Sequence, residues 1–318
     1  MHKADPELGF APIPNSQGAM IFPNGPDIPA RYDADGFRVP LEEQQSASER
    51  RPLILALGCS YTYGDGTYAE DTYPYLVGQY LGGTTKNGGV CSYGLSQMIM
   101  LGRRLVPMYK PDYLIVQYSP WLVSRAISPF APSLFGKVPT PYFYKKDGLA
   151  LHWPVFQTII MDLPVDRYGA SPTGRRDFIS FLWNVGLPLC IHDDFNMVCY
   201  QLKKIFGFIP EPTNDEGEVI QSVYGELAKL SKENGAKLII VVLKRFNEQV
   251  IIPYSLFPQD ALVVDAYQAL VAKLPIANYQ NYLEQYAHWR GTPLRPVDLH
   301  PNARAHRIIA EEIVSKIK

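Results

Sequence analysis

The stretch Leu53-Ile-Leu-Ala-Leu-Gly-Cys-Ser-Tyr-Thr-Tyr-Gly-Asp-Gly66 decides the fold of this chain. Five consecutive apolar residues, Leu53 to Leu57, are typical of a strand buried on both faces of a sheet, and the run stops at Gly58. Ser60 therefore follows the carboxyl end of a strand, where open α/β sheets bind their ligands. A serine hydroxyl is a weak nucleophile by itself, so Ser60 is a candidate nucleophile that needs a base and an orienting acid from elsewhere in the chain.

The composition is typical of a globular protein and argues against several classes of function. Of the 318 residues, 47% are hydrophobic and 19% are charged, and a chain of this length can bury a sizeable core. A formal net charge of -1 gives no electrostatic footprint for nucleic acid, so nucleic-acid partners are set aside. No run approaches the roughly 18 apolar residues of a membrane span, and the N-terminal residues lack the apolar core of a signal peptide. We therefore expect a cytoplasmic protein with no membrane span.

Metal ligands are not indicated by the cysteines or histidines. The cysteine spacing is unlike that of zinc sites, and we expect free, mostly buried thiols at Cys59, Cys91, Cys190 and Cys199. His192-Asp-Asp194 offers possible ligands, but an exposed loop or the start of a helix explains the same residues. We expect no metal and no other cofactor.

Residues 51–318 alternate between strand-like and helix-like patterns. Strands are expected at 53–57, 113–117 and 237–243, with a shorter, last strand at 262–264, and helices at 71–81, 95–109 and 302–317. Thr213-Asn-Asp-Glu216 fits a capping box at the start of a further helix. Strand and helix in alternation favour right-handed crossovers and a parallel sheet.

Two parts of the chain depart from this alternation. Residues 1–50 are rich in Pro, Gly, Asn and Asp and are predicted to be an extended arm that packs on the 51–318 domain, with disorder as the alternative. Residues 119–212 contain several prolines, a hairpin signal at Lys146-Asp-Gly148 and the apolar stretch 178–190. We predict that 119–212 is an insertion that caps the sheet.

A candidate base and acid stand together near the C-terminus, in Asp298-Leu-His-Pro-Asn302. The proline favours extended geometry at His300, and in extended chain side chains two residues apart point to the same side. The Asp298 carboxylate can therefore reach the His300 imidazole, fix its tautomer and leave its other nitrogen free to accept a serine proton. Asn302 is expected to cap the following helix. The alternative is that His300 only packs and that Asp298 is a surface or capping carboxylate.

Three blocks of the sequence resemble the SGNH hydrolases, the GDSL esterase and lipase superfamily. Gly58-Cys-Ser-Tyr-Thr-Tyr-Gly64 resembles the first block of that family, Asn87-Gly-Gly-Val-Cys-Ser-Tyr-Gly94 the second, and Asp298-Leu-His-Pro-Asn302 the last. The blocks stand in the family's order along the chain. The resemblance implies a flavodoxin-like three-layer α/β/α sandwich around a central, mostly parallel sheet.

The same resemblance implies roles for individual residues. Ser60 would be the nucleophile, His300 the general base and later the general acid, and Asp298 the residue that orients His300. The oxyanion hole would comprise the backbone N–H of Ser60, a backbone N–H of the second block and an asparagine side chain of a third block. Such donors act where negative charge develops, and losing one costs about 3 kcal/mol or more.

The sequence departs from the family pattern at three positions. Cys59 stands where an aspartate is usual, and alternation predicts that it faces away from Ser60 into the core. Ser92 stands where the second block has a glycine, yet its backbone N–H can still donate. Trp121 stands where the third block has its asparagine; its indole N–H is a donor, and a pocket wall is the alternative role.

We therefore predict a serine hydrolase that cleaves an O-acyl ester of a small molecule or carbohydrate through an acyl-enzyme. Tyr61 and Tyr63 flank the nucleophile and are candidates for lining the acyl pocket. Two alternatives remain. One is an acyltransferase that uses the same acyl-enzyme, and the other is a binding protein of the same fold with an impaired oxyanion hole.

Overall fold

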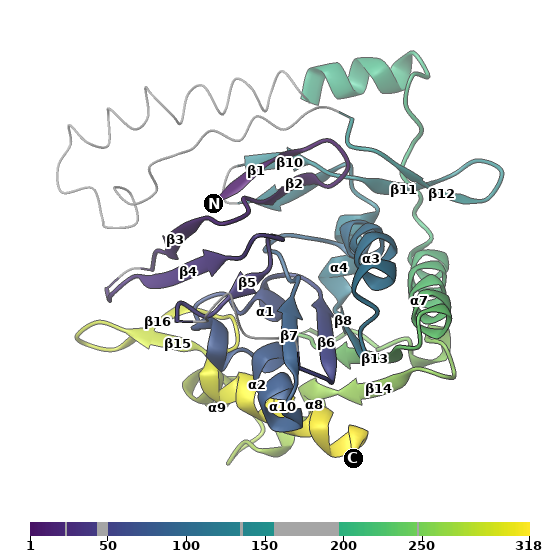
Figure 1. Cartoon of the computed structure of the whole chain (residues 1–318). Helices are drawn as coiled ribbons and strands as arrows, with labels where there is room; N and C mark the ends of the chain where they lie inside the picture. The colour runs from purple at the N-terminus through teal and green to yellow at the C-terminus, as the bar shows by residue number, and fades with distance from the viewer. Residues whose placement is uncertain (23, 43–49, 134–135, 156–196, 247) are drawn as a thin grey trace, which may run out of the picture.

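The computed structural model describes residues 1–22, 24–42, 50–133, 136–155, 197–246 and 248–318 (Figure 1). Their core is an eight-stranded sheet in the order β14-β13-β8-β6-β7-β5-β4-β3. Five neighbouring strands of this sheet are parallel: β14 (Leu262–Asp265), β13 (Lys237–Val242), β8 (Tyr113–Tyr118), β6 (Leu53–Leu57) and β7 (Thr84–Asn87). Every residue of β6 is fully buried, as expected of a strand covered on both faces.

The order of the parallel strands fixes where a ligand can bind. β6 comes first along the chain, with β7 on one side of it and β8 on the other. The chain therefore passes outward from β6 to β7 and then crosses to β8, which is the 2-1-3-4-5 order of flavodoxin-like folds. Ligands of such sheets bind beyond the carboxyl ends of the strands at this switch point. The predicted flavodoxin-like fold around a central, mostly parallel sheet is confirmed.

Helices cover both faces of the sheet and complete three layers (Figure 1). One group packs together on one face: α2 (Tyr73–Leu81), α8 (Ala266–Ala272), α9 (Tyr279–Tyr286) and α10 (Ala303–Ile317). The other group comprises α3 (Leu95–Tyr109), α4 (Pro120–Ala126) and α7 (Glu216–Glu233). In the part of the chain that the structure describes, none of the helices is long and apolar enough to cross a membrane.

The helix that follows His300 begins as predicted. The Asn302 side chain accepts a hydrogen bond from the backbone N–H of Ala305 at 3.1 Å and so caps α10. Its amide also donates to the backbone oxygens of Gln285 and Ala287, both at 3.0 Å, which ties the loop to the end of α9. The loop that carries His300 is therefore fixed at its exit.

The N-terminal residues extend the central sheet. β5 (Arg38–Val39) pairs antiparallel with β7, and β4 (Ile28–Tyr32) and β3 (Gln17–Met20) continue outward from it. A separate hairpin of β1 (His2–Asp5) and β2 (Gly9–Pro12) precedes them. Through β5 the N-terminal segment reaches the middle of the domain, where Arg38 is completely buried.

The predicted insertion is described only in part. After α4 come two hairpins, formed by β9 (Phe130–Ser133) with β10 (Gly136–Pro139) and by β11 (Tyr142–Lys145) with β12 (Leu149–His152). The turn of the second hairpin is Lys146-Asp-Gly148, as predicted, and residues 197–205 are helical. The stretch 178–190, with Cys190, and the residues His192 to Asp194 lie outside the described residues. That 119–212 forms a cap stays a prediction.

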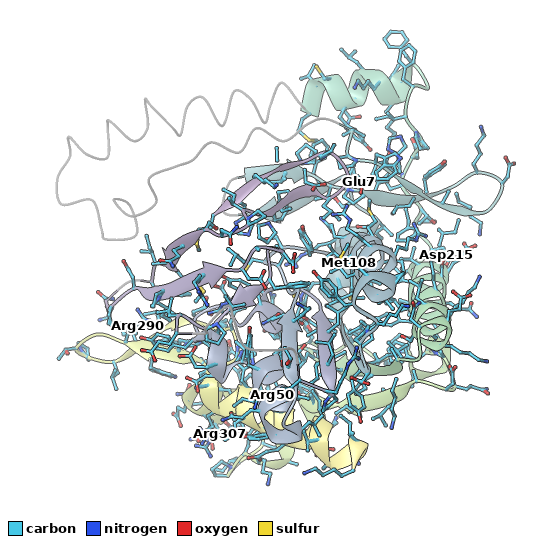
Figure 2. All side chains as sticks on the ribbon, in the orientation of Figure 1. Glu7, Arg50, Met108, Asp215, Arg290 and Arg307 are labelled. Carbon is cyan, nitrogen blue, oxygen red and sulfur yellow. The ribbon has the colours of Figure 1, made fainter. Side chains whose placement is uncertain are left out.

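Two expectations about local structure need correction. The residue that caps α7 is Asp215, labelled in Figure 2, whose carboxylate accepts from the N–H of Glu218 at 2.9 Å. Thr213 is not the cap, because α7 begins only at Glu216; Thr213 Oγ1 instead accepts the N–H of Asp215 at 3.1 Å. The strand β14 is not the last one either. An antiparallel hairpin of β15 (His288–Arg290) and β16 (Arg295–Asp298) follows it and ends at the candidate acid.

Candidate active site

Ser60 is the first residue of a one-turn helix, α1 (Ser60–Tyr63), directly after β6. A Cβ at Gly58 would lie 2.1 Å from Thr62 Oγ1, so the close turn between strand and helix requires glycine there. Gly64 ends α1 at φ 84°, in the left-handed region. Ser60 is 7% exposed and lies at the carboxyl end of β6, beside the switch point of the sheet.

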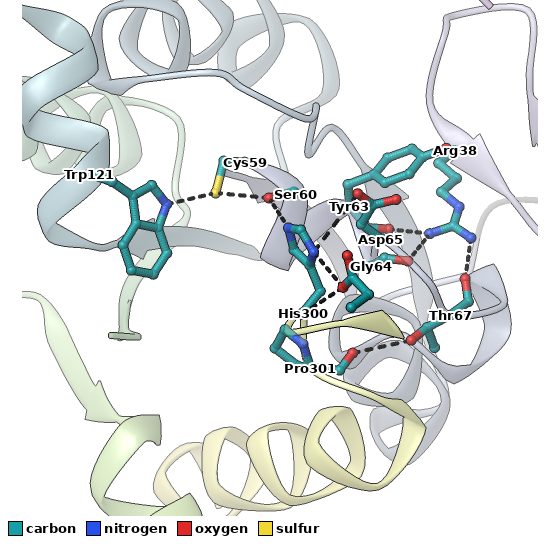
Figure 3. A network of polar contacts seen from close by, with 11 residues as sticks. Arg38, Cys59, Ser60, Tyr63, Gly64, Asp65, Thr67, Trp121, His300 and Pro301 are labelled. Atoms are coloured by element: carbon teal, nitrogen blue, oxygen red, sulfur yellow. Dashed lines mark hydrogen bonds and ion pairs between the residues drawn. The ribbon is translucent and has the colours of Figure 1, made fainter. Parts of the chain in front are cut away.

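His300 approaches Ser60 from the opposite end of the chain, as Figure 3 shows. His300 Nε2 lies 2.9 Å from Ser60 Oγ, and His300 Nδ1 lies 2.7 Å from Asp298 Oδ1. The same carboxylate oxygen accepts the backbone N–H of His300 at 2.7 Å, which fixes the carboxylate relative to the imidazole. Because Nδ1 donates to a carboxylate, Nε2 is left to accept the serine proton. The structure brings together the three residues predicted to form the triad.

The charges around His300 favour its protonated form. Burial opposes a charged imidazole, but the hydrogen bond and charge of Asp298, with a contribution from Asp65, outweigh burial and raise the pKa of His300. Burial also opposes an ionised Asp298, but the hydrogen bonds and charge of His300 outweigh it and lower the pKa of that carboxyl. The pair is therefore suited to hold a proton taken from Ser60.

The second sequence block lies against α1. Val90 N–H donates to Gly58 O at 3.2 Å, and Asn87 Nδ2 donates to Thr62 O at 3.0 Å. In the same loop Ser92 has φ 68°, a left-handed conformation that favours glycine. This geometry accounts for a glycine being usual at the position, and Ser92 adopts it at a cost in backbone energy. Its backbone N–H as an oxyanion donor stays a prediction.

Cys59 is buried but does not face away from Ser60, which corrects the expectation from alternation. Its Sγ lies 3.8 Å from Ser60 Oγ. Cys59 itself is extended, but it is the N-cap residue of α1 and Ser60 is already helical, so strand alternation does not hold between the two residues. Gln117 Nε2 donates to the same sulfur at 3.3 Å, while Gln117 Oε1 accepts the N–H of Cys59 at 3.2 Å. The thiol is thus held between the nucleophile and the end of β8.

Trp121 lies on α4, across the switch point from Ser60. Its Nε1–H donates to Cys59 Sγ at 3.3 Å, so the indole donor is bonded to sulfur in this structure. Its ring meets the ring of Tyr61 edge-on, with centroids 5.0 Å apart, and the Arg245 guanidinium carbon lies 5.2 Å from its centroid. These contacts favour the pocket-wall role over the oxyanion role.

The two tyrosines beside the nucleophile point in different directions. Tyr61 packs edge-on against His300, with centroids 5.3 Å apart, and so lies in the site. Burial raises the pKa of Tyr61 well above its ordinary value, which keeps its hydroxyl neutral. Tyr63 instead packs against Tyr32 of β4, under the guanidinium of Arg38. The structure does not bring Tyr63 to Ser60.

Three further residues of the site region were missed in the sequence analysis. Asp65 lies near His300, Arg38 lies under the turn after α1, and Arg245 lies over Trp121. Gly64-Asp-Gly66 is a turn signal that could have drawn attention to Asp65. For Arg38 and Arg245 the signal is absent, because their positions depend on contacts with distant segments.

Among the described residues, no group of three His, Cys, Asp or Glu side chains could hold a metal ion.

Among the comparisons with known proteins, only the search of solved structures finds similar chains. No family model and no curated protein matches the sequence. The chain resembles the solved structure of a GDSL-like lipase from Bacteroides thetaiotaomicron, with 12% identity, 84% of this chain and 87% of that chain covered, and a TM-score of 0.38. It also resembles a variant of an acetyl xylan esterase from Geobacillus stearothermophilus, with 15% identity, coverage of 85% and 95%, and a TM-score of 0.40.

A third similar structure is an acetyl xylan esterase from the rumen bacterium Butyrivibrio proteoclasticus. The identity is 10%, 92% of this chain and 69% of that chain are covered, and the TM-score is 0.41.

Proposed function

We propose that this protein is an SGNH-type serine esterase that cleaves an O-acyl ester through an acyl-enzyme. The observation that carries the proposal is the chain of contacts from Ser60 Oγ to His300 Nε2 at 2.9 Å and from His300 Nδ1 to Asp298 Oδ1 at 2.7 Å. A hydroxyl, an imidazole and a carboxylate in this arrangement can activate the hydroxyl as a nucleophile.

In the first half of the reaction, His300 takes the proton of Ser60 while Ser60 Oγ bonds to the carbonyl carbon of the ester. Asp298 stabilises the imidazolium that forms. The tetrahedral intermediate then expels the alcohol, which receives the proton from His300, and the acyl group remains on Ser60. In the second half, a water molecule gives its proton to His300 and attacks the acyl carbon. The bond from the acyl carbon to Ser60 Oγ then breaks, Ser60 Oγ takes the proton back from His300, and the acid is released.

The negative oxygen of the intermediate needs hydrogen-bond donors. We assign this role to the backbone N–H groups of Ser60 and Ser92, in line with the first and second sequence blocks. Trp121 then serves as a wall of the pocket with Tyr61, since its own N–H is bonded to Cys59. Two aromatic walls close to Ser60 suit a small acyl group, carried by a small molecule or by a carbohydrate.

Labelling with a fluorophosphonate tests the proposal. A fluorophosphonate phosphonylates an activated serine, so we expect one adduct on the peptide that contains Ser60 and none in Ser60→Ala. Ser124→Ala is the matched control, because Ser124 is an exposed serine on α4 whose hydroxyl donates to the nearby Trp121 O. Labelling that persists in Ser60→Ala would contradict the assignment of the nucleophile, and an unlabelled wild-type protein would favour the binding-protein alternative.

An acyltransferase would form the same adduct and differ only in its acceptor. Product analysis with an activated acetyl ester distinguishes the two, in water alone and with added sugar alcohols. We expect free acetate as the main product in both conditions. Transfer to the added alcohol in excess over hydrolysis would replace the esterase with the transferase.

A further inference from the structure

The turn after α1 presents a second carboxylate to His300. The backbone N–H groups of Gly64 and Asp65 both donate to Ser60 O, at 2.8 Å and 3.0 Å, so the turn is fixed directly to the nucleophile residue. Gly64 and Gly66, on either side of Asp65, have φ 84° and 80°. A Cβ at Gly66 would lie 2.7 Å from His288 Nε2, so the backbone must pass close to that ring. These contacts restrict the position of the backbone at Asp65.

Arg38 holds the same turn from the other side, as Figure 3 shows. Its guanidinium is fully buried and donates to the backbone oxygens of Tyr63, Gly64 and Thr67, with the Gly64 bond at 2.7 Å. Thr67 Oγ1 then donates to Pro301 O at 3.2 Å, next to His300. A buried charge without partners is costly, so the guanidinium must keep these backbone acceptors, which lie on both sides of Asp65. The turn is thus joined to both the nucleophile and the base.

Asp65 Oδ2 lies 4.0 Å from His300 Nδ1, the nitrogen that is also 2.7 Å from Asp298 Oδ1. At 4.0 Å the contact is too long for a hydrogen bond, so Asp65 acts on His300 through its charge. The Asp65 side chain is 23% exposed, which leaves little water to screen that charge. Two carboxylates therefore face one ring nitrogen.

Several other titratable or charged groups lie around Asp65 and His300 and affect their protonation. They are Cys59, Tyr61 and Tyr63 from α1 and its N-cap, Cys91 from the second sequence block, His288 from β15 and Arg38 from β5. Burial and the like charge of Asp298 raise the pKa of Asp65, and the charges of His300 and Arg38 act against them. The ionised form of Asp65 is favoured most when His300 is protonated, which is the state that follows proton transfer from Ser60.

We propose that Asp65 is a second carboxylate partner of His300, a positioning residue that stabilises the imidazolium formed during the reaction and that Arg38 holds in place. The inference rests on the proposed function for its catalytic consequence. The effect on His300 itself is independent of that function and can be measured without a substrate.

The direct test is the titration of His300 by NMR in the inactive Ser60→Ala background. Asp65→Asn keeps the shape of the side chain and removes the charge, so the titration midpoint of His300 should fall by about half a pH unit or more. Glu70→Gln, at an exposed carboxylate on the next turn of chain, should leave the midpoint unchanged. Asp65→Glu restores the charge and should restore the midpoint at least in part. An unchanged midpoint in folded Asp65→Asn overturns the proposal.

A second measurement reads the catalytic consequence. With Ser60 intact, Asp65→Asn should lower kcat about threefold to tenfold with little change in KM, because only the charged state formed during reaction is affected. In Asp298→Asn, where Asp65 is the remaining carboxylate, the same change should cost a larger factor. Equal factors in the two backgrounds would contradict the partnership. If the His300 midpoint shifts but no ester is cleaved and Ser60 is not labelled, the proposed function fails while the contact stands.

Discussion

His300 Nε2 lies 2.9 Å from Ser60 Oγ although the two residues are 240 positions apart in the chain. The fold produces this contact in two steps. β6 ends at the switch point of the sheet and delivers Ser60 there, while the β15–β16 hairpin and the capped start of α10 deliver His300. Neither segment alone holds both the nucleophile and its base.

Replacing the acid should separate its catalytic role from any structural one. Asp298→Asn keeps an acceptor and the shape of the side chain, but an amide can also donate to Nδ1 and so favour the wrong tautomer. We expect kcat to fall by about 10³ to 10⁴, as in the serine proteases, while the midpoint of urea unfolding changes little. A loss of activity that follows a loss of folded protein would instead assign Asp298 to stability.

Trp121→Phe distinguishes the two roles open to Trp121. The substitution keeps an aromatic wall against Tyr61 and removes the donor that binds Cys59. For a wall, kcat should fall by less than about tenfold, whereas the loss of an oxyanion donor costs about 10² to 10³. A loss of the larger size would mean that the indole turns to the intermediate during the reaction.

Ser92→Gly should stabilise the protein and leave it active. At φ 68° a serine carries a backbone strain that glycine does not, although glycine gains more freedom in the unfolded chain. We expect the free energy of unfolding to rise by about 0.5 to 1 kcal/mol, with hydrolysis within about threefold of wild type because the backbone N–H is retained. Ser92→Ala is the control, since it keeps the strain and should give no such gain.

Acid should destabilise the fold through buried neutral histidines. Burial lowers the pKa of His306 to about 3, while its Nδ1 accepts the N–H of Tyr73 at 3.2 Å. Between pH 6.5 and 3 the unfolded chain therefore binds a proton that the native chain does not, and stability falls as the pH falls. The slope from one such group approaches about 1.4 kcal/mol per pH unit.

His2 and His288 also lower the stability of the fold as the pH falls, whereas His300 has the opposite effect. Burial also lowers the pKa of His2, to about 4, and that of His288. The pKa of His300 is raised, so its contribution is present below pH 6.5 and is lost as the pH rises through its native value. Urea unfolding of His306→Gln should show a lower stability at pH 7 and a shallower slope between pH 6.5 and 4. A slope equal to that of wild type would exclude His306 as a source.

Local patterns predicted the elements that bury apolar residues on a regular spacing. β6 was predicted from its apolar run, α3 from its periodicity, and the start of α10 from its cap at Asn302. The meeting of Ser60, Asp298 and His300 was predicted from their order along the chain and from the family resemblance. All of these signals are carried by neighbouring residues or by recognised motifs.

The contacts around the triad could not be predicted in this way. Arg38 is buried because β5 pairs with β7, and Asp65 faces His300 because Arg38 and Ser60 O fix its turn. Cys59 lies beside Ser60 because Ser60 is already helical, whereas alternation assumes that both residues are extended. In each case the position of a side chain depends on a segment far away in the sequence.

The central claim, that Ser60 carries the acyl group during turnover, is tested most directly by rapid-quench mass spectrometry with an activated acetyl ester. We expect an acetyl group on the Ser60 peptide within the first turnover, decaying as acetate appears, and no such adduct in Ser60→Ala or His300→Ala. Acetate released from wild-type protein with no adduct on Ser60 at any time, or an adduct on another residue, would contradict the account.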